Sequence, residues 1–322
     1  KLSNKARCEH KKNSQAYYSI ITTGGTIMRQ KSFEESPYGK LYLIPTPIGN
    51  LDDMTFRSIK TLQEVDFILA EDTRHTQKLL NHFEIQTPQK SFHEHNTQER
   101  IPSVIEWLKE GENIAQVSDA GTPSISDPGF ELVQACIQEG ITVIPLPGSN
   151  AAITALIASG LVPPPFYFYG FLPRKKKDRV TELTALSSHS ETVILYESPY
   201  RLDDCFNLIA QVYGEEKEVV LCRELTKKHE EFIRGTALEL KTLCEEEELK
   251  GECCILIGTT RSEEVTTSVA TEETASCEHL SLEEQVQWAI EHQQLSQKDA
   301  IKWVAKQNQL KKQDVYKLIH QE

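Results

Sequence analysis

The feature that most constrains the fold is a regular alternation of strand-like runs with helical patterns, which begins at Lys40. Runs of strand length occur at Leu41–Pro45, Asp66–Ala70, Lys90–His93, Asn113–Val117 and Thr142–Pro145. Between them apolar residues recur at helical spacing, as at Phe56, Ile59 and Leu62. Strands that alternate with helices form βαβ units, so the sequence predicts a mainly parallel sheet covered by helices.

A second α/β unit follows the run Pro163-Pro164-Pro165, which neither a helix nor a central strand can cross. Its predicted strands are Phe166–Gly170, Thr192–Tyr196, Val219–Glu224, Phe232–Gly235 and Cys253–Gly258, with helices at about 177–187, 200–212 and 236–244. We expect an N-terminal α/β domain over residues 39–160 and a C-terminal α/β domain over residues 161–260, with mainly parallel or mixed sheets.

The ends of the chain differ from this α/β core. Residues 1–36 hold seven Lys and Arg against three Glu without any sustained period, so residues 1–38 are predicted to be disordered or non-native, with Met28 as the natural start. A basic RNA-binding arm is the competing interpretation. Residues 261–279 form a polar linker, and residues 280–322 predict three short helices of helix-turn-helix type, the third around Val315. Ser281 with Glu284, and Ser296 with Asp299, have capping-box spacing.

Composition excludes several classes of protein. The net charge of −13 argues against a protein that coats nucleic acid through a general positive field, so any RNA contacts must come from local basic patches. No apolar run reaches the roughly 18 residues of a membrane span, and the N-terminus lacks the apolar core of a signal peptide, so we expect a cytoplasmic protein. The eight cysteines form no CxxC pair and predict free thiols. No metal site is predicted, because His93 and His95 have no third ligand at suitable spacing.

Glycine, proline and small polar residues gather in the loops after the predicted strands of the first domain. These loops are Pro45–Asn50, Glu71–His75, Ser118–Gly129 and Pro147–Ala152. Ligands of open α/β sheets bind beyond the carboxyl ends of the strands, where glycine lets main chain approach them closely. None of the loops contains GxGxxG or GxxxxGK[ST], so they favour a weakly charged, nucleoside-like ligand over a polyphosphate nucleotide.

These loops resemble the tetrapyrrole methylase superfamily and, within it, the branch of ribosomal RNA small subunit methyltransferases. The resemblance rests on Leu41–Asp53, Glu71–Arg74, Ser118–Gly129, Pro147–Ala152, Gly170–Arg174, Tyr196–Arg201 and Cys222–Lys227. It runs from about Gly39 to Gly258, and the helical tail resembles the C-terminal helix-turn-helix of that branch. Cys222 is a departure, since a glycine is expected there; we expect it to alter packing more than chemistry.

The resemblance implies a homodimer in which S-adenosylmethionine binds between the two domains. It also implies 2′-O-methylation of a cytidine in the decoding region of 16S ribosomal RNA. Carried over residue by residue, the cofactor contacts are Pro45, Ala120, Gly121, Thr122, Ile125, Asn150, Ala151, Tyr196, Leu225 and Gly251.

Methyl transfer to a ribose hydroxyl needs an in-line approach and a group that takes or shares the proton. Asp119, at a strand end among glycines, is the first candidate for this catalytic carboxylate, and Asp72 is the second. Glu197 and Glu224 are weaker candidates. The structural alternatives are a turn or helix cap for Asp119 and an ion pair with Arg74 for Asp72.

Basic residues near the predicted cleft are the candidates for RNA binding. They are Arg74, Arg174, Lys175, Lys176, Lys177, Arg179 and Arg201. Five of the six residues in 174–179 are positive, although such a run can also be a solvated surface. His93 and His95 could contact an extruded nucleotide. In the tail, Lys298, Lys302 and Lys306 lie four apart on one helical face, and both RNA and protein remain possible partners.

Two other functions compete with RNA methylation. One is methylation of a tetrapyrrole carbon, which requires neither the basic run nor the helical tail. The other is a non-catalytic ribosome-binding protein that retains the cofactor fold.

Overall fold

The computed structural model describes residues 29–259, 281–293 and 295–308, together with residues 310, 312, 315 and 316. Two compact units divide the chain. The first extends to Thr154 and includes the separate segment Glu224–Glu230, whereas the second comprises Ala155–Arg223 and the residues from Glu231 onward. The division therefore falls within a helix rather than at the run Pro163-Pro164-Pro165.

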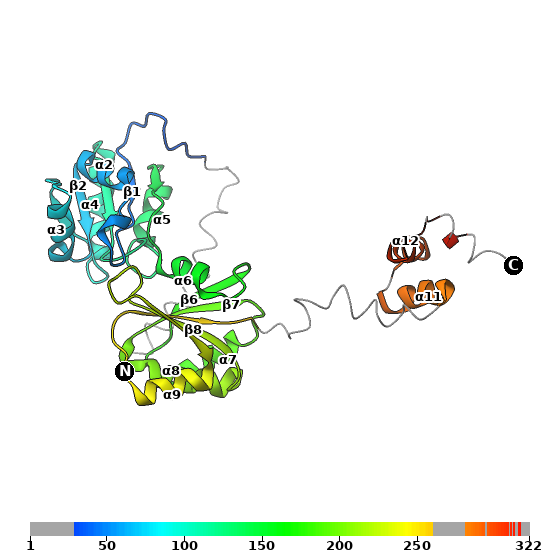
Figure 1. The fold of residues 1–322 in the computed structure, drawn as a ribbon. Coiled ribbons are helices and arrows are strands. Elements are labelled where there is room, and N and C mark those ends of the chain that lie inside the picture. The colour runs from blue at the N-terminus through cyan, green and yellow to red at the C-terminus, as the bar shows by residue number, and fades with distance from the viewer. Residues whose placement is uncertain are drawn as a thin grey trace. The chain divides into compact units, whose positions relative to one another are not determined.

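The first unit is an open α/β sheet with the strand order β3-β2-β4-β1-β5, in which every pairing is parallel (Figure 1). Its strands are β1 (Leu41–Leu43), β2 (Phe67–Ala70), β3 (Gln89–Ser91), β4 (Ile114–Val117) and β5 (Val143–Pro145). Its helical elements are η1 (Leu51–Asp53), α2 (Phe56–Glu64), α3 (Thr73–His82), α4 (Thr97–Lys109) and α5 (Phe130–Gln138), and α6 (Ala151–Ser159) crosses the division.

Both faces of this sheet are buried, as a parallel sheet requires. Ile68 and Ala70 of β2 pack in one apolar cluster with residues of α2 and α3. Phe67 and Leu69, which alternate with them along the strand, pack in a second cluster with residues of α4 and α5. The near-continuous apolar strands of the sequence are therefore explained by helices on both sides.

The strand order places a topological switch point between β4 and β1. From β1 the chain crosses to β2, toward the β3 edge of the sheet. From β4 it crosses in the opposite direction to β5, which forms the other edge. The loops after these two neighbouring strands consequently diverge, and such a divergence at the carboxyl edge is where open α/β sheets bind ligands.

Residues 29–38 differ from the expectation of disorder. The side-chain amide of Gln30 donates to the carbonyl of Val143 at 2.7 Å and accepts from the main-chain N–H of Val143 at 2.9 Å. The ammonium of Lys40 donates to the carbonyls of Ser32 and Glu34. The segment thus covers the exposed edge of β5, and the earlier part of the predicted extension, residues 1–28, lies outside the described residues.

The second unit contains a mixed sheet with the order β6-β7-β10-β8-β9. Its elements are β6 (Phe166–Phe171), α7 (Lys176–Leu186), β7 (Thr192–Glu197), η2 (Pro199–Arg201), α8 (Leu202–Tyr213), β8 (Glu218–Arg223), β9 (Glu231–Thr236), α9 (Ala237–Glu246) and β10 (Cys253–Ile257). β6 and β7 pair in parallel, whereas β7–β10, β10–β8 and β8–β9 are antiparallel. The helices α7, α8 and α9 cover one face (Figure 1), where Phe206 is fully buried among Leu183, Leu195 and Leu240.

The described part of the C-terminal tail forms a two-helix unit of α11 (Leu282–Gln293) and α12 (Gln297–Gln307). Ser281 and Glu284 exchange the two hydrogen bonds of a capping box, and the hydroxyl of Ser296 accepts from the main-chain N–H of Asp299, as predicted. Of the third predicted helix, helical turns at Lys312, Val315 and Tyr316 are described, and the rest lies outside the described residues.

The described cysteines are free thiols, as expected, and Cys222 is completely buried in β8. Burial raises the pKa of Cys136 to about 12, so this thiol stays protonated at neutral pH. Among the described helices, none combines the length and apolar character needed to cross a membrane.

Candidate functional site

The loops after β1 and β4 are tied together at the switch point. The main chains of Thr46 and Gly121 exchange two hydrogen bonds, of 2.9 and 3.0 Å. The buried hydroxyl of Thr46 donates to the carbonyl of Ser118, and the hydroxyl of Ser118 donates to the carbonyl of Gly121. The result is a closed turn at the carboxyl edge of the sheet, with Gly121 at a φ of +79° that side-chain-bearing residues rarely adopt.

The loop after β5 joins the same cluster. The hydroxyl of Thr122 donates to the carbonyl of Ser149 at 2.9 Å, and a Cβ placed on Gly148 would lie 2.6 Å from the Cβ of Pro45. The side chain of Asn150 accepts from the main-chain N–H of Ile153 and so caps the start of α6. The structure therefore brings together the predicted cofactor residues Pro45, Ala120, Gly121, Thr122, Asn150 and Ala151. Ile125 lies on the same β4 loop with an exposed side chain.

A distant segment, Glu224–Glu230, reaches this cluster from between β8 and β9. The main-chain N–H of Asn50 donates to the hydroxyl of Thr226 at 3.1 Å, and Gly49 leaves no room for a Cβ beside Thr226 and Lys227. The predicted cofactor residue Leu225 is buried next to this contact. Leu225 therefore lies in the first unit, although its position in the sequence is in the second half of the chain.

Three carboxylates interact at this edge of the sheet, Asp119 and Asp127 from the β4 loop and Glu71 from the loop after β2. Burial, together with the negative charges of Asp127 and Asp119, raises the pKa of Glu71. Burial and Asp119 also raise the pKa of Asp127, although a hydrogen bond from Ser118 acts in the opposite direction. Asp119 itself accepts a hydrogen bond from the main-chain N–H of Asp72 at 3.1 Å. Raised carboxyl pKa values at a strand edge are typical of sites that exchange protons. Glu71 and Asp127 are not among the catalytic candidates predicted from the sequence.

Asp72 has a structural role instead. Its carboxylate caps α3 and holds the guanidinium of Arg74 through Nε at 3.0 Å and a terminal nitrogen at 2.7 Å. These hydrogen bonds from Arg74 lower the pKa of Asp72. The ion pair that the sequence offered as the structural alternative is therefore present, and Asp72 is the weaker proton acceptor at this edge.

Arg74 lines a hollow of about 610 Å³ on the first unit. The hollow lies between the start of α3 (Thr73, Arg74 and Gln77) and the segment Ile85–Gln89. None of its lining residues is acidic, and Arg74 is the basic residue among them. The hollow is therefore suited to a polar or anionic ligand.

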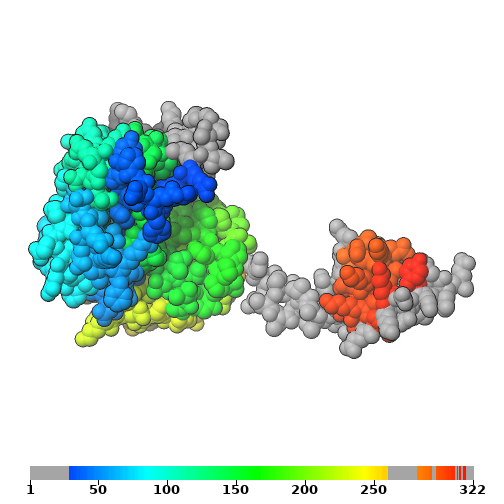
Figure 2. Space-filling model, turned by 90° about the horizontal axis from the view of Figure 1, so that it is seen from above, coloured from blue at the N-terminus to red at the C-terminus, as the bar shows by residue number. Residues whose placement is uncertain are grey.

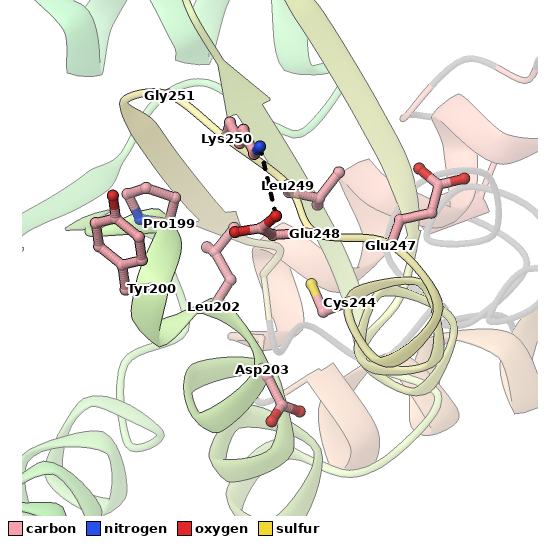
Figure 3. A pocket seen from close by; sticks show the side chains of 10 residues that line it. All are labelled: Pro199, Tyr200, Leu202, Asp203, Cys244, Glu247, Glu248, Leu249, Lys250 and Gly251. Carbon is pink, nitrogen blue, oxygen red and sulfur yellow. Dashed lines mark ion pairs between the residues drawn. The ribbon is translucent and has the colours of Figure 1, made fainter.

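The second unit contains the other two predicted cofactor residues. Tyr196 lies near the end of β7 opposite Cys254, and Gly251 precedes β10, so both lie at one end of the β7–β10 pair. Gly251 also lines a hollow of about 450 Å³ between η2 and the segment that follows α9 (Figure 3). Asp203, Glu247 and Glu248 line that hollow, and Lys250 pairs with Glu248, so its charge disfavours phosphate.

The predicted basic residues of the second unit fall into two groups. Arg174, Lys175, Lys176 and Lys177 are exposed at the start of α7. Arg179 is buried, with a side chain 5% exposed, and its guanidinium binds Asp204 at 2.9 Å. Arg201 is half-buried and binds Glu197, whose side chain is 1% exposed. Arg179 and Arg201 therefore serve as partners of carboxylates within the fold.

The two histidines after β3 are adjacent, with ring centroids 6.0 Å apart. The buried Nδ1 of His93 has no hydrogen-bond partner. Within the described residues, no group of three His, Cys, Asp or Glu side chains is arranged to hold a metal ion.

The carboxylate cluster predicts a pH dependence of stability. Because the pKa of Glu71 is raised in the folded protein, that protein binds a proton over a pH interval in which the unfolded chain has lost it. The free energy of unfolding therefore falls as the pH rises through this interval. We expect Glu71→Gln to increase stability at neutral pH and to flatten its decline as the pH rises above the ordinary glutamate range of about pH 4, in urea titrations. An equal effect of Glu106→Gln, an exposed position on α4, would contradict the assignment.

Comparison with known proteins agrees with this geometry. The family model of tetrapyrrole (corrin/porphyrin) methylases matches residues 40–241. The chain is 54% identical over 240 residues to "Ribosomal RNA small subunit methyltransferase I" of Bacillus subtilis (strain 168), a match that covers 74% of this chain and 82% of that protein. The protein of the same name from Synechocystis sp. is 51% identical over 68% of this chain and 79% of its own length.

Solved structures share the fold at low sequence identity. Diphthine synthase superposes with a TM-score of 0.55 at 12% identity and covers 68% of this chain and 90% of its own. The uroporphyrin-III C-methyltransferase of Thermus thermophilus, complexed with S-adenosyl homocysteine, superposes with a TM-score of 0.50 at 14% identity over 68% of this chain and 97% of its own. The chain belongs to the tetrapyrrole methylase family, within the group that includes the ribosomal RNA small subunit methyltransferase I proteins.

Proposed function

We propose that this chain transfers a methyl group from S-adenosylmethionine to small-subunit ribosomal RNA, at the 2′-hydroxyl of a cytidine in the decoding region. The observation that carries this proposal is the 54% identity to a ribosomal RNA methyltransferase over most of both chains. The geometry of the site supports the proposal, because the loops after β1, β4 and β5 form one cluster at the switch point.

The residues of the first unit fit S-adenosylmethionine. Where the loops after β1, β4 and β5 meet, the small residues Ala120, Gly121 and Ala151 carry little side-chain bulk that would keep a ligand from the main chain. Pro45, Thr122, Ile125, Asn150 and Leu225 complete the proposed cofactor contacts of this unit, and Tyr196 and Gly251 supply those of the second. The bound cofactor supplies an activated methyl group on a sulfonium. Ala120, Gly121 and Ala151 carry no side-chain charge that would stabilise the sulfonium before transfer and so raise the barrier.

The proton of the attacking hydroxyl requires an acceptor. Asp119 remains a candidate, and Glu71 and Asp127 join it, because the raised pKa of both makes them better proton acceptors than an ordinary carboxylate. Asp72 is less suited, since Arg74 occupies both of its oxygens. Its proposed role is to hold Arg74 at the rim of the hollow between α3 and Ile85–Gln89.

RNA contacts are proposed at Arg74 and at the basic run Arg174–Lys177. Three lysines at the N-terminus of α7 oppose the helix dipole, which favours negative charge there. Their position therefore does not serve helix stability, and binding of phosphates explains it better. Arg179 is not part of the proposed RNA-binding surface, because its side chain is buried and paired with Asp204.

Homodimer formation in the cytoplasm completes the proposal. Apolar side chains of the second unit are exposed on α6 and β6, among them Ile157 at 76% and Phe171 at 57%. Exposed apolar side chains such as these are available for a protein interface if they form a contiguous patch.

The proposed activity is tested by incubating the protein and S-adenosylmethionine with small ribosomal subunits that lack the modification. Mass spectrometry of the digested RNA is expected to show one added methyl group on a cytidine ribose. Uroporphyrinogen incubated in parallel should gain none. A methylated tetrapyrrole with unmodified RNA would replace the proposal with the competing activity.

The basic run yields a separate prediction. Changing Lys175, Lys176 and Lys177 to Glu is expected to weaken RNA binding and to make its salt dependence shallower, because fewer counterions are released. Affinity for S-adenosylmethionine, measured by calorimetry, should not change. Lys176 also lies 3.5 Å from Asp204, so a variant with Lys175→Glu and Lys177→Glu alone keeps that ion pair and controls for folding. Equal salt slopes for variant and wild type would mean that the run is a solvated surface.

A further inference from the structure

The helices α11 and α12 form a unit with an apolar core of its own. Val286 and Ala289 of α11 pack against Ala300, Ile301 and Val304 of α12, and all of them are buried. Trp288 and Trp303 stack with ring centroids 6.2 Å apart. Figure 1 shows α11 and α12 side by side, and in Figure 2 their described atoms (orange to red) form one group. The apolar face of α12 is therefore used within this unit.

The opposite side of α12 presents a stripe of lysines formed by Lys298, Lys302 and Lys306. All three are exposed, and none pairs with a carboxylate among the residues that the structure describes. A spacing of four residues corresponds to a rise of about 6 Å along an α-helix, so the ammonium groups follow one another along one side. Charges so aligned without partners repel each other, and binding of an anionic polymer would relieve this repulsion.

The unit is additional to the methylase fold. The family match ends at residue 241, before α11 begins. The uroporphyrin-III C-methyltransferase structure matches over 97% of its own length while it covers 68% of this chain. An enzyme named for a small macrocycle thus requires nothing beyond the shared fold, and the extra unit is available for a larger substrate.

We propose that the lysine stripe of α12 binds the phosphate backbone of the substrate RNA. This inference rests on the proposed function, since it takes ribosomal RNA as the substrate. The stripe supplies sequence-independent affinity, while the loops of the first unit carry out the chemistry. A protein partner is less favoured at the stripe, because the buried apolar residues of α12 pack in the core of the unit and the stripe itself is formed by lysines.

The test uses the full chain with all three lysines changed to Gln, and a matched variant with the same lysines changed to Arg. Lys, Gln and Arg have similar helix propensities, so both variants should keep α12 folded. Binding to a transcript of the small-subunit RNA is measured over a range of salt concentrations. Removing three phosphate contacts should reduce the slope of log K against log salt by about 2. Between about 50 and about 200 mM salt, the wild type should therefore lose about 20-fold more affinity than the Gln variant. The Arg variant should behave like the wild type.

The outcomes separate this inference from the proposed function. If the wild type methylates small-subunit RNA and the Gln variant binds the transcript with an unchanged slope, the stripe does not bind RNA. If the Gln variant loses affinity for intact small subunits but not for the naked transcript, the partner is a ribosomal protein and the inference is overturned. If the wild type methylates no RNA but still binds the transcript through the stripe, the proposed function is wrong, whereas the inference that the stripe binds RNA still holds.

Discussion

Changing Gly121 to Val is expected to abolish binding of S-adenosylmethionine, with a loss of affinity of about 100-fold or more. Gly121 has a φ of +79°, a conformation that costs a β-branched residue about 1–3 kcal/mol. The new Cβ would lie 3.3 Å from the Cγ2 of Ile48 and 3.7 Å from the carbonyl oxygen of Ser149, so its methyl groups would enter the space between the loops after β1, β4 and β5. Relief of that crowding would separate Gly121 from Thr46 and open the turn on which the proposed cofactor contacts depend.

Gly140→Val is the matched control for this experiment. Gly140 has a similar φ of +69°, and no atom lies within 4 Å of the position of an added Cβ. It lies in the turn between α5 and β5, at the end of the sheet opposite the cofactor loops. Calorimetry should show a normal affinity for Gly140→Val together with a comparable loss of thermal stability. If the two variants lose affinity equally, the effect is general strain, and if Gly121→Val binds normally, the cofactor lies elsewhere.

Changing Arg201 to Met is expected to lower the free energy of unfolding by about 3 kcal/mol, because it leaves a buried carboxylate without its cation. Oε1 of Glu197 accepts from Nε of Arg201 at 2.7 Å and from the main-chain N–H of Ser198 at 2.7 Å, while Oε2 has no hydrogen-bond partner. The side chain of Arg201 is 26% exposed, so water replaces part of the lost interaction and the expected value lies at the lower end for buried ion pairs.

A double-mutant cycle measures this interaction directly. Adding Glu197→Gln to Arg201→Met removes the unpaired charge, so the double variant should recover part of the lost stability in urea unfolding. Additive losses would mean that Glu197 and Arg201 do not act as a pair. Arg201→Lys keeps the positive charge and should be milder. If Arg201→Lys is stable but binds RNA poorly, Arg201 also contacts the substrate.

Local pattern was sufficient for most of the secondary structure. The strand around Leu69, the helix from Phe56 and the capping box of Ser281 and Glu284 lie where the sequence predicts them. Each depends on side-chain periodicity or on hydrogen bonds between residues three apart, and both are visible in a short window of sequence. The loops after β1, β4 and β5 were identified for the same reason, since glycine and proline mark turns locally.

The directions of the individual strands in the second, mixed sheet were not visible in this way. The strand β10 lies between β7 and β8 and is antiparallel to both. A buried parallel strand and a buried antiparallel strand are both short apolar runs, so their direction is set by the path of the chain between them.

Roles that depend on burial and long-range contact were decided in three dimensions. The run 174–179 looks almost uniformly basic, yet Arg179 is buried against Asp204 while Lys175 and Lys177 are exposed, because the turn of α7 directs one side inward. Burial and, after it, the charges of Asp127 and Asp119 raise the pKa of Glu71, and both of these aspartates follow a neighbouring strand of the sheet. Leu225 joins the cofactor loops because Thr226 accepts a hydrogen bond from Asn50, a residue 176 positions earlier in the chain. The desolvation and the charges that set these roles come from groups far apart in sequence, which no local pattern contains.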